Sequence, residues 1–288
     1  MRSKKSLLAT TLALLCSASI MAQSDFGVWT EISVEKSFGK KFSIEASAEN
    51  RLANNATQPQ RWNFSVGGSY KPVKWLKLGA GYVFIYNRNF QEVEEKYKED
   101  DNGNIVKDKN DNPIIEGYNI DHGYWRPRHR AYFDVQGKWD VGRFSISLRE
   151  RYLYNYYVET EALRDKYRNP AQPGYTGPIY TFNGKDFMKY EEGEWDVKKA
   201  KTKHALRSRL QVEYDIKGLP LTPFVSCEVT NELDNAMAYD KVRVQAGTEW
   251  KITKKHILSG AYLYQNENQE IGPNQSLHAI KIGYKFKF

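Results

Sequence analysis

The last stretch of the chain, residues 276–288, alternates strictly between apolar side chains and polar or small ones, up to a carboxyl-terminal phenylalanine. Because successive side chains of a β-strand point to opposite faces, this pattern predicts a two-faced strand. One face carries His278, Ile280, Ile282, Tyr284, Phe286 and Phe288, and the other carries Leu277, Ala279, Lys281, Gly283, Lys285 and Lys287. The chain therefore needs a sheet that separates an apolar environment from a polar one.

A final strand with aromatic residues at alternate positions resembles the closing strand of bacterial outer-membrane β-barrels. In those barrels the terminal Phe is part of the signal that the barrel assembly machinery reads. The resemblance assigns this role to Tyr284, Phe286 and Phe288. It implies that the apolar face contacts outer-membrane lipid and that the polar face lines the lumen.

The first residues predict export. Residues 1–22 combine a basic start, an apolar run from Leu7 to Leu15 and small residues up to Ala22. This is the pattern of a secretory signal peptide cleaved before Gln23, and the apolar run is much shorter than the roughly 20 residues of a transmembrane helix. We expect a mature barrel domain over residues 23–288 in the cell outer membrane. After cleavage only Cys227 remains, so no intramolecular disulfide is expected.

Composition excludes two classes of protein. The net charge is +8, the mean hydropathy is -0.71, and the mature part has no long apolar helix candidate, which excludes a helical membrane protein. A membrane barrel fits, because lipid-facing and lumen-facing residues average out along each strand. The basic residues are interleaved with Glu along strands instead of being clustered, so no nucleic-acid partner is expected.

The mature chain divides into alternating segments of strand length. There are eleven, at residues 28–35, 42–52, 61–70, 76–86, 128–136, 143–154, 203–214, 223–232, 241–250, 258–264 and 276–288. Short turns alternate with long polar connections, of which residues 87–123 and 158–200 are the longest. We therefore predict an all-β fold, an antiparallel up-and-down transmembrane β-barrel of 10 to 12 strands. Bacterial single-chain barrels have an even number of strands, which leaves ten if residues 23–38 lie outside the wall and twelve if a long loop hides a strand.

The polar face of these segments carries charges of both signs. Facing the same way are Glu45, Glu49, Arg51, Arg61, Arg128, Arg130, Asp134, Arg149, Arg151, Arg207, Arg209, Glu213, Glu228, Arg243 and Glu249. In a narrow barrel these residues can neutralise one another through Arg–carboxylate pairs. We predict a lumen charge network that fills the barrel.

Alternation alone also fits a soluble periplasmic lipid-binding barrel whose apolar side is turned inward. Aromatic residues concentrate toward strand ends and small residues lie at mid-strand, as in the run of Phe42, Ala46 and Ala48. This distribution resembles the aromatic girdles at membrane interfaces and favours apolar side chains that face lipid.

The segments resemble an uncharacterised family of Bacteroidota outer-membrane proteins, domain-of-unknown-function family 2490. The resemblance rests on residues 45–51 (EASAENR), 125–130 (WRPRHR), 206–210 (LRSRL) and 223–228 (PFVSCE), on Arg243 and Gly247, and on residues 283–288 (GYKFKF). It covers nearly all of the mature chain. It implies an exported β-barrel and supplies no activity, cofactor or site residue.

The sequence holds little catalytic chemistry. A lipid-modifying enzyme of the outer membrane would need a Ser and a His side by side, but His204 and Ser208 lie four residues apart, about 13 Å along a strand. The acidic stretch 99–111 does not match a calcium loop, and residues 101–104 predict a tight hairpin turn. We expect no cofactor, no metal and no enzymatic activity. The expected function is a structural, porin-like barrel, narrow or plugged, with outer loops that contact an unidentified ligand or partner.

Overall fold

The computed structural model describes residues 25–168, 177–182, 185–268 and 275–288, and within these ranges the regular structure is almost entirely β-strand. The proposed signal peptide, residues 1–22, lies outside the described residues. Eleven strands form a closed barrel: β1 (Asp25–Phe38), β2 (Phe42–Ala53), β3 (Gln58–Val73), β4 (Leu76–Asn89), β7 (Tyr124–Val141), β8 (Phe144–Tyr157), β12 (Lys201–Tyr214), β13 (Leu221–Glu232), β14 (Ala238–Lys251), β15 (His256–Glu267) and β16 (Gln275–Lys287). Within the described ranges, no helix is long and apolar enough to cross a bilayer.

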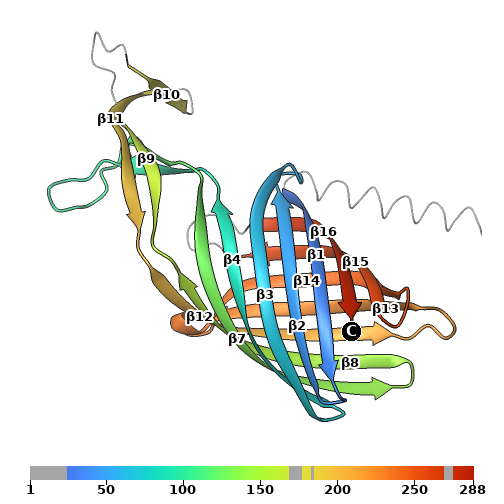
Figure 1. Ribbon diagram of the computed structural model, residues 1–288. Helices are drawn as coiled ribbons and strands as arrows, with labels where there is room; N and C mark the ends of the chain where they lie inside the picture. The colour runs from blue at the N-terminus through green and yellow to red at the C-terminus, as the bar shows by residue number, and fades with distance from the viewer. Residues whose placement is uncertain (1–24, 169–176, 183–184, 269–274) are drawn as a thin grey trace, which may run out of the picture. The chain divides into compact units, whose positions relative to one another are not determined.

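The barrel closes between its first and last strands, which lie side by side in Figure 1 (blue and red). β1 pairs with β16 in parallel, in a register that runs from Asp25 opposite Leu277 to Glu35 opposite Lys287. The other neighbours with a described register pair antiparallel, as β1 does with β2. Each of the eleven predicted segments corresponds to one of these strands.

The expected barrel is confirmed as all-β and closed, but its purely antiparallel pattern is wrong. Strands that alternate in direction around a ring return antiparallel only if their number is even. With eleven strands, the first and the last run the same way, so their ladder has to be parallel. The barrel has neither ten nor twelve strands but eleven, because residues 25–38 form a regular wall strand and the strands of the long connections lie outside the barrel sheet.

The two long connections, expected to be loops, contain strands of their own. They form a five-stranded sheet in the order β10–β11–β9–β6–β5, made of β5 (Glu92–Tyr97), β6 (Ile115–Asp121), β9 (Thr160–Arg168), β10 (Ile179–Phe182) and β11 (Lys185–Lys198). The chain divides into two compact units. The barrel unit runs up to Asn87 and includes Pro127–Tyr157 and Thr202–Phe288, and the second unit consists of Arg88–Arg126 and Val158–Lys201.

Ion pairs join the strands of the five-stranded sheet. Arg164 of β9 donates from Nε and Nη2 to the two carboxylate oxygens of Asp121 on β6, at 2.5 and 2.9 Å. Lys198 of β11 lies 2.6 Å from the same carboxylate, and both cations also pair with Asp196. The hydrogen bond from Arg164 is the main reason that the pKa of Asp121 falls to about 2, and the same pair raises the pKa of Arg164. Ion pairs and apolar packing both join these strands, because Tyr118 of β6 and Phe187 of β11 are buried and their rings lie 4.7 Å apart, edge to face.

Candidate functional site

The outer wall of the barrel is apolar. Large hydrophobic side chains stay exposed in the middle of the strands, including Ile32 at 63%, Val66 at 50% and Ile282 at 47%. The neighbouring positions that point inward are polar and buried, such as Glu228 at 2% and Asp134 at 4%. The orientation predicted from the alternation, with apolar side chains outward and charged side chains inward, is confirmed.

Tyrosine–histidine pairs interrupt this apolar wall at several heights, from His256 at the start of β15 to Tyr82 at mid-strand opposite Val66. In each pair a tyrosine Oη lies within hydrogen-bond distance of a histidine Nδ1: Tyr82 with His129 (2.6 Å), Tyr152 with His204 (2.5 Å), Tyr284 with His256 (2.6 Å), and Tyr262 with His278. Each histidine also contacts a second aromatic ring. The pairing satisfies polar groups that would otherwise face an apolar surface alone. The pairing of these side chains was not predicted from the sequence.

One carboxylate lies on the outer face, at Glu150 of β8, where the apolar alternation fails. Its Oε2 accepts a hydrogen bond of 2.6 Å from the hydroxyl of Ser208 on β12. His204 is engaged elsewhere, with Tyr152, and its backbone N–H donates to Asp234. The Ser208 hydroxyl is therefore bound to a carboxylate, and His204 does not act on it.

Glu228 of β13 is the centre of the charge network inside the barrel. Its two carboxylate oxygens lie 2.7 Å from Arg209 Nη2, 3.2 Å from Arg243 Nη1, 3.3 Å from Arg149 Nη2 and 3.5 Å from Arg207 Nε. The four arginines come from β8, β12 and β14. One buried carboxylate thus ties together four strands.

A second charge centre lies on β2, at Glu49. This carboxylate accepts from Arg51 Nε at 2.7 Å and from Asn63 Nδ2 at 2.6 Å. The guanidinium of Arg51 stacks on Trp29, with its Cζ 3.7 Å from the ring centroid, and Arg243 approaches the same ring at 5.0 Å. Trp29 is almost fully buried at 2%. It is the large apolar side chain on which the two arginines rest.

A third centre involves β7, where Asp134 pairs with Arg151 of β8 at 2.7 Å. The neighbouring inward residue, Tyr132, lies under the same guanidinium, whose Cζ is 4.1 Å from the ring centroid. The Tyr132 ring lies directly over Gly67 and Gly81, which face each other on β3 and β4. Glycine at these two positions makes room for the ring inside the barrel.

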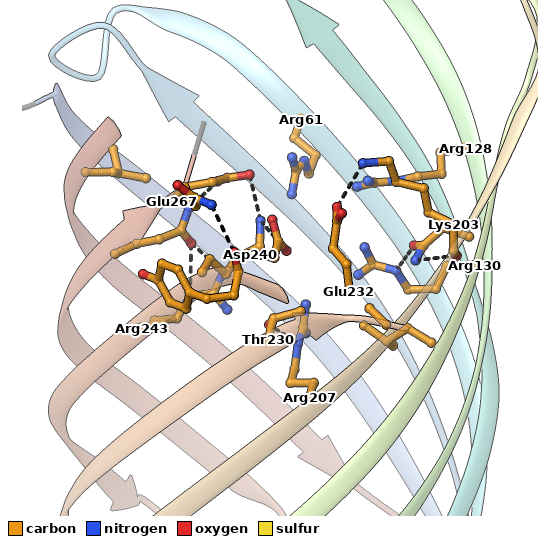
Figure 2. A pocket seen from close by; sticks show the side chains of 18 of the residues that line it. Arg61, Arg128, Arg130, Lys203, Arg207, Thr230, Glu232, Asp240, Arg243 and Glu267 are labelled. Carbon is orange, nitrogen blue, oxygen red and sulfur yellow. Dashed lines mark hydrogen bonds and ion pairs between the residues drawn. The ribbon is translucent and has the colours of Figure 1, made fainter. Parts of the chain in front are cut away.

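The lumen contains a cavity of about 330 Å³ near the end where β1 begins (Figure 2). It lies among the first residue of β1, the β13–β14 connection and the end of β15. Its charged lining consists of the cations Arg51, Arg61, Arg128, Arg130, Lys203, Arg207, Lys241 and Arg243, and of the anions Asp25, Glu232, Asp240 and Glu267. The cations outnumber the anions, so the cavity is electropositive.

The predicted network residues divide into three groups. Nine meet around the three centres described above: Glu49, Arg51, Asp134, Arg149, Arg151, Arg207, Arg209, Glu228 and Arg243. Glu45 and Glu213 pair instead with lysines, Lys285 at 2.6 Å and Lys138 at 3.1 Å, and Glu249 is exposed and forms no ion pair with a described residue. Arg61, Arg128 and Arg130 line the cavity and have no carboxylate partner among the described residues.

The predicted charge network included neither the lysines nor Trp29. Lys281 lies 2.5 Å from Glu31 and 3.5 Å from Glu49, and Lys203 pairs with Glu232 at 2.8 Å. The signal was present, because these lysines stand at inward positions of the alternation. The residues of the proposed assembly signal, Tyr284, Phe286 and Phe288, are in place at the end of β16, with the last two rings 4.7 Å apart edge to face.

The acidic stretch in the second unit forms tight turns. Asp100 accepts the backbone N–H groups of Asn102 and Asn104 on Oδ1, and Gly103 adopts a φ of 80°. An isolated bridge joins Glu99 to Ile105. The hairpin turn predicted at residues 101–104 is confirmed. In the described part of the chain, no group of three His, Cys, Asp or Glu side chains is arranged to hold a metal ion.

Comparison with known proteins gives a family and likenesses to solved structures. A family model described as "Protein of unknown function (DUF2490)" matches residues 26–276. No curated protein matches the chain. Among solved structures, the chain is similar to the β-domain of the Bordetella autotransporter Brka, with a TM-score of 0.48 and 10% identity over 88% of this chain and 86% of that chain.

Proposed function

The chain belongs to the DUF2490 family of proteins of unknown function, and we propose that it is an outer-membrane β-barrel, without catalytic activity, whose lumen is closed by ion pairs. The observation that carries the proposal is the closed barrel with an apolar outer wall and a charged interior. In water such an exposed apolar wall would favour aggregation, whereas hydrocarbon solvates it.

The spacing of the aromatic side chains supports a wall of membrane height. On β16, the ring of His278 contacts Tyr264 toward one end of the strand, and the ring of Phe286 contacts His256 toward the other end. Eight residues separate them, which at about 3.3 Å per residue is about 26 Å along the strand, or about 20 Å across a bilayer for a strand tilted by about 40°. This is close to the apolar band of about 25 Å in outer-membrane barrels.

The interior argues against a soluble lipid carrier. Such a barrel needs an apolar interior for an acyl chain. Here the interior contains the clusters around Glu228, Glu49 and Asp134. These clusters also support a plugged lumen, because their buried side chains occupy the interior, and Arg243 of β14 reaches Trp29 of β1, three strands away around the barrel.

The bonding on the outer wall supports the absence of lipid hydrolysis. The hydroxyl of Ser208 donates to Glu150, while His204 is bound by Tyr152. A serine nucleophile needs a base that accepts its proton and is itself oriented by a third group. Among the described residues, no histidine is hydrogen-bonded to Ser208, whose partner is Glu150.

Two valine variants test whether the wall faces lipid. Val66 stands at mid-strand on β3 and Val141 at the end of β7, and both are exposed, at 50% and 63%. In a bilayer, Val66→Arg should destabilise the barrel by about 2–4 kcal/mol and Val141→Arg by about 0–1 kcal/mol. Equilibrium urea unfolding in phospholipid vesicles measures both. A water-exposed wall would tolerate both arginines equally, and that result would refute the membrane proposal.

Two further measurements test closure and catalysis. The folded protein should show heat-modifiable migration in detergent gels and should float with vesicles. In planar bilayers it should give no stable conductance steps of porin size, and such steps would contradict a plugged lumen. Turnover of phospholipid or lipid A that disappears in Ser208→Ala would contradict the absence of catalysis.

We also propose that the carboxyl-terminal strand recruits the barrel assembly machinery and that the short turns face the periplasm. The Phe288→Ala variant should then reach the periplasm and accumulate there unassembled. Lys254→Ala in the short turn between β14 and β15 is a control that leaves the last strand intact. Equal outer-membrane levels of the two variants would exclude the role of Phe288.

A further inference from the structure

The cavity in the lumen has one wall on which positive charge is left without a counterion. That wall is formed by Arg61 of β3 and by Arg128 and Arg130 of β7. Figure 2 shows the three side chains on the rim of the same cavity. We propose that this wall binds an oxyanion of the phosphate class, either free phosphate or a phosphate monoester.

The other cations near the cavity already have carboxylate partners. Lys203 lies 2.8 Å from Glu232, and Lys241 lies 2.7 Å from Glu267. The remaining arginines of the lining belong to the clusters around Glu228 and Glu49. Glu232 and Glu267 are therefore each paired with a lysine, and neither forms an ion pair with an arginine of the β3–β7 wall.

Each arginine of the wall is held by a single neutral oxygen. Arg61 Nε donates to Asn87 Oδ1 at 2.6 Å, Arg130 Nε to Asn155 Oδ1 at 2.7 Å, and Arg128 Nη1 to the hydroxyl of Tyr157 at 2.7 Å. These three bonds orient the guanidinium groups without neutralising them.

Hydrogen-bond donors remain available on this wall. A guanidinium carries five N–H donors, so one bond each leaves most of them unused. Arg128 Nε is buried and has no hydrogen-bond partner among the described residues. Asn155 is itself fixed, because its Nδ2 donates to the carbonyl oxygen of Lys203 at 3.4 Å. The wall is thus preorganised for an acceptor with several oxygens.

The chemistry of the wall selects a phosphate-type ligand. Arginine forks bind phosphate oxygens in pairs, and an ion with three or more oxygens can engage several guanidinium groups at once. The like charges of the three arginines repel one another when the cavity is empty, and a dianion removes that repulsion. The volume of about 330 Å³ lies at the lower end of the range for ligand pockets, about 300–1,000 Å³, which suits a small monoester.

Phosphate binding goes beyond the closed barrel proposed above. Only the side from which the anion enters rests on the proposed orientation of the barrel in the membrane. With the short turns toward the periplasm, the cavity lies toward the cell exterior. Arg51, Arg207 and Arg243 of the clusters around Glu49 and Glu228 line the cavity on the side of the lumen, so we infer that it is closed at its inner end.

Calorimetric titration of the full chain, folded in zwitterionic detergent, tests the site with inorganic phosphate in one series and glycerol 3-phosphate in the other. We expect saturable binding of at least one of them, weakened about tenfold or more in Arg61→Gln and in Arg130→Gln. Lys138→Gln removes the same charge at a residue outside the cavity lining and should leave the affinity unchanged. The relative affinity of the two probes identifies free phosphate or an ester as the better ligand.

Absence of binding for both probes, or an equal loss in Lys138→Gln, would overturn the proposal. Folding of the variants is checked by urea unfolding without phosphate, where Arg130→Gln should be at least as stable as the parent because it removes repulsion. Phosphate should raise the urea midpoint of the parent and not that of Arg130→Gln. Loss of vesicle flotation together with intact phosphate binding would remove only the membrane proposal.

Discussion

Removing the carboxylate at the centre of the lumen should be the most costly isosteric change in the barrel. In Glu228→Gln, four guanidinium groups lose their shared partner while their strands keep them in place. At a mean separation of about 3.2 Å and an effective dielectric constant of about 20, each pair contributes about 5 kcal/mol of attraction before repulsion among the arginines and desolvation are subtracted. Removing one partner of a buried ion pair costs about 3–5 kcal/mol net, which is our expectation for this variant.

The control for this experiment is Glu213→Gln. Its carboxylate pairs with one lysine, Lys138, and the two side chains are 30% and 43% exposed. Solvent screening should limit its loss to about 0–1 kcal/mol. Equilibrium urea unfolding in detergent micelles, followed by heat-modifiable gel migration and extrapolated linearly to zero urea, measures both variants. The double variant Glu228→Gln with Arg149→Gln should recover part of the loss, because it leaves one uncompensated cation fewer.

A loss below about 1 kcal/mol in Glu228→Gln, equal to that of Glu213→Gln, would refute the reasoning. It would mean that water or mobile anions reach the four arginines and that the lumen is not closed by this cluster.

Two more predictions concern the five-stranded sheet and the packing inside the barrel. Because hydrogen bonding by Arg164 depresses the pKa of Asp121 to about 2, the carboxylate stabilises the sheet above pH 4 and loses this contribution as the pH falls from about 4 to about 2. Pepsin cleavage within residues 115–121 should therefore rise over this window, and Asp121→Asn should already be cleaved faster at pH 4; a cleavage rate independent of pH in the parent would contradict this. In the barrel, a Cβ at Gly81 would lie 2.5 Å from the Tyr132 hydroxyl and 2.6 Å from the carbonyl oxygen of Val66, so Gly81→Ala should cost about 1–3 kcal/mol in urea unfolding. Gly260→Ala, whose added Cβ meets nothing within 4 Å, is the matched control, and equal stability of the two variants would show that the Tyr132 ring and the β3 backbone both adjust without cost.

The barrel strands could be predicted because their signal is local. Each residue of the wall faces either the apolar outside or the charged inside, so alternation along a single segment is enough to place Ile282 outward and Lys281 inward. The count of eleven segments already implied that the first and last strands run in the same direction. The assumption of an even strand number led to the wrong expectation of a purely antiparallel barrel.

The five-stranded sheet and the ion-pair partners could not be predicted, because both depend on contacts between distant residues. Strands β6 and β9 lack apolar alternation, and the bonds between Asp121 and Arg164 join residues 43 positions apart. The choice of partners in the lumen depends on the stagger of the closed barrel, which brings Arg149 to Glu228 across 79 positions. For the same reason, no local pattern showed that Arg61, Arg128 and Arg130 would meet without a carboxylate.

The parallel pairing of β1 with β16 also determines at which rim of the barrel a peptide fused to either end of the described barrel would lie. Asp25 starts at the rim at which β16 begins, whereas Phe288 ends at the other rim. In an even-numbered barrel the two termini share a rim, and a short linker can join them. Here a linker would have to span the whole height of the wall, so circular permutants should assemble poorly. If the barrel spans a bilayer, reporter peptides fused before Asp25 and after Phe288 would be exposed to different compartments.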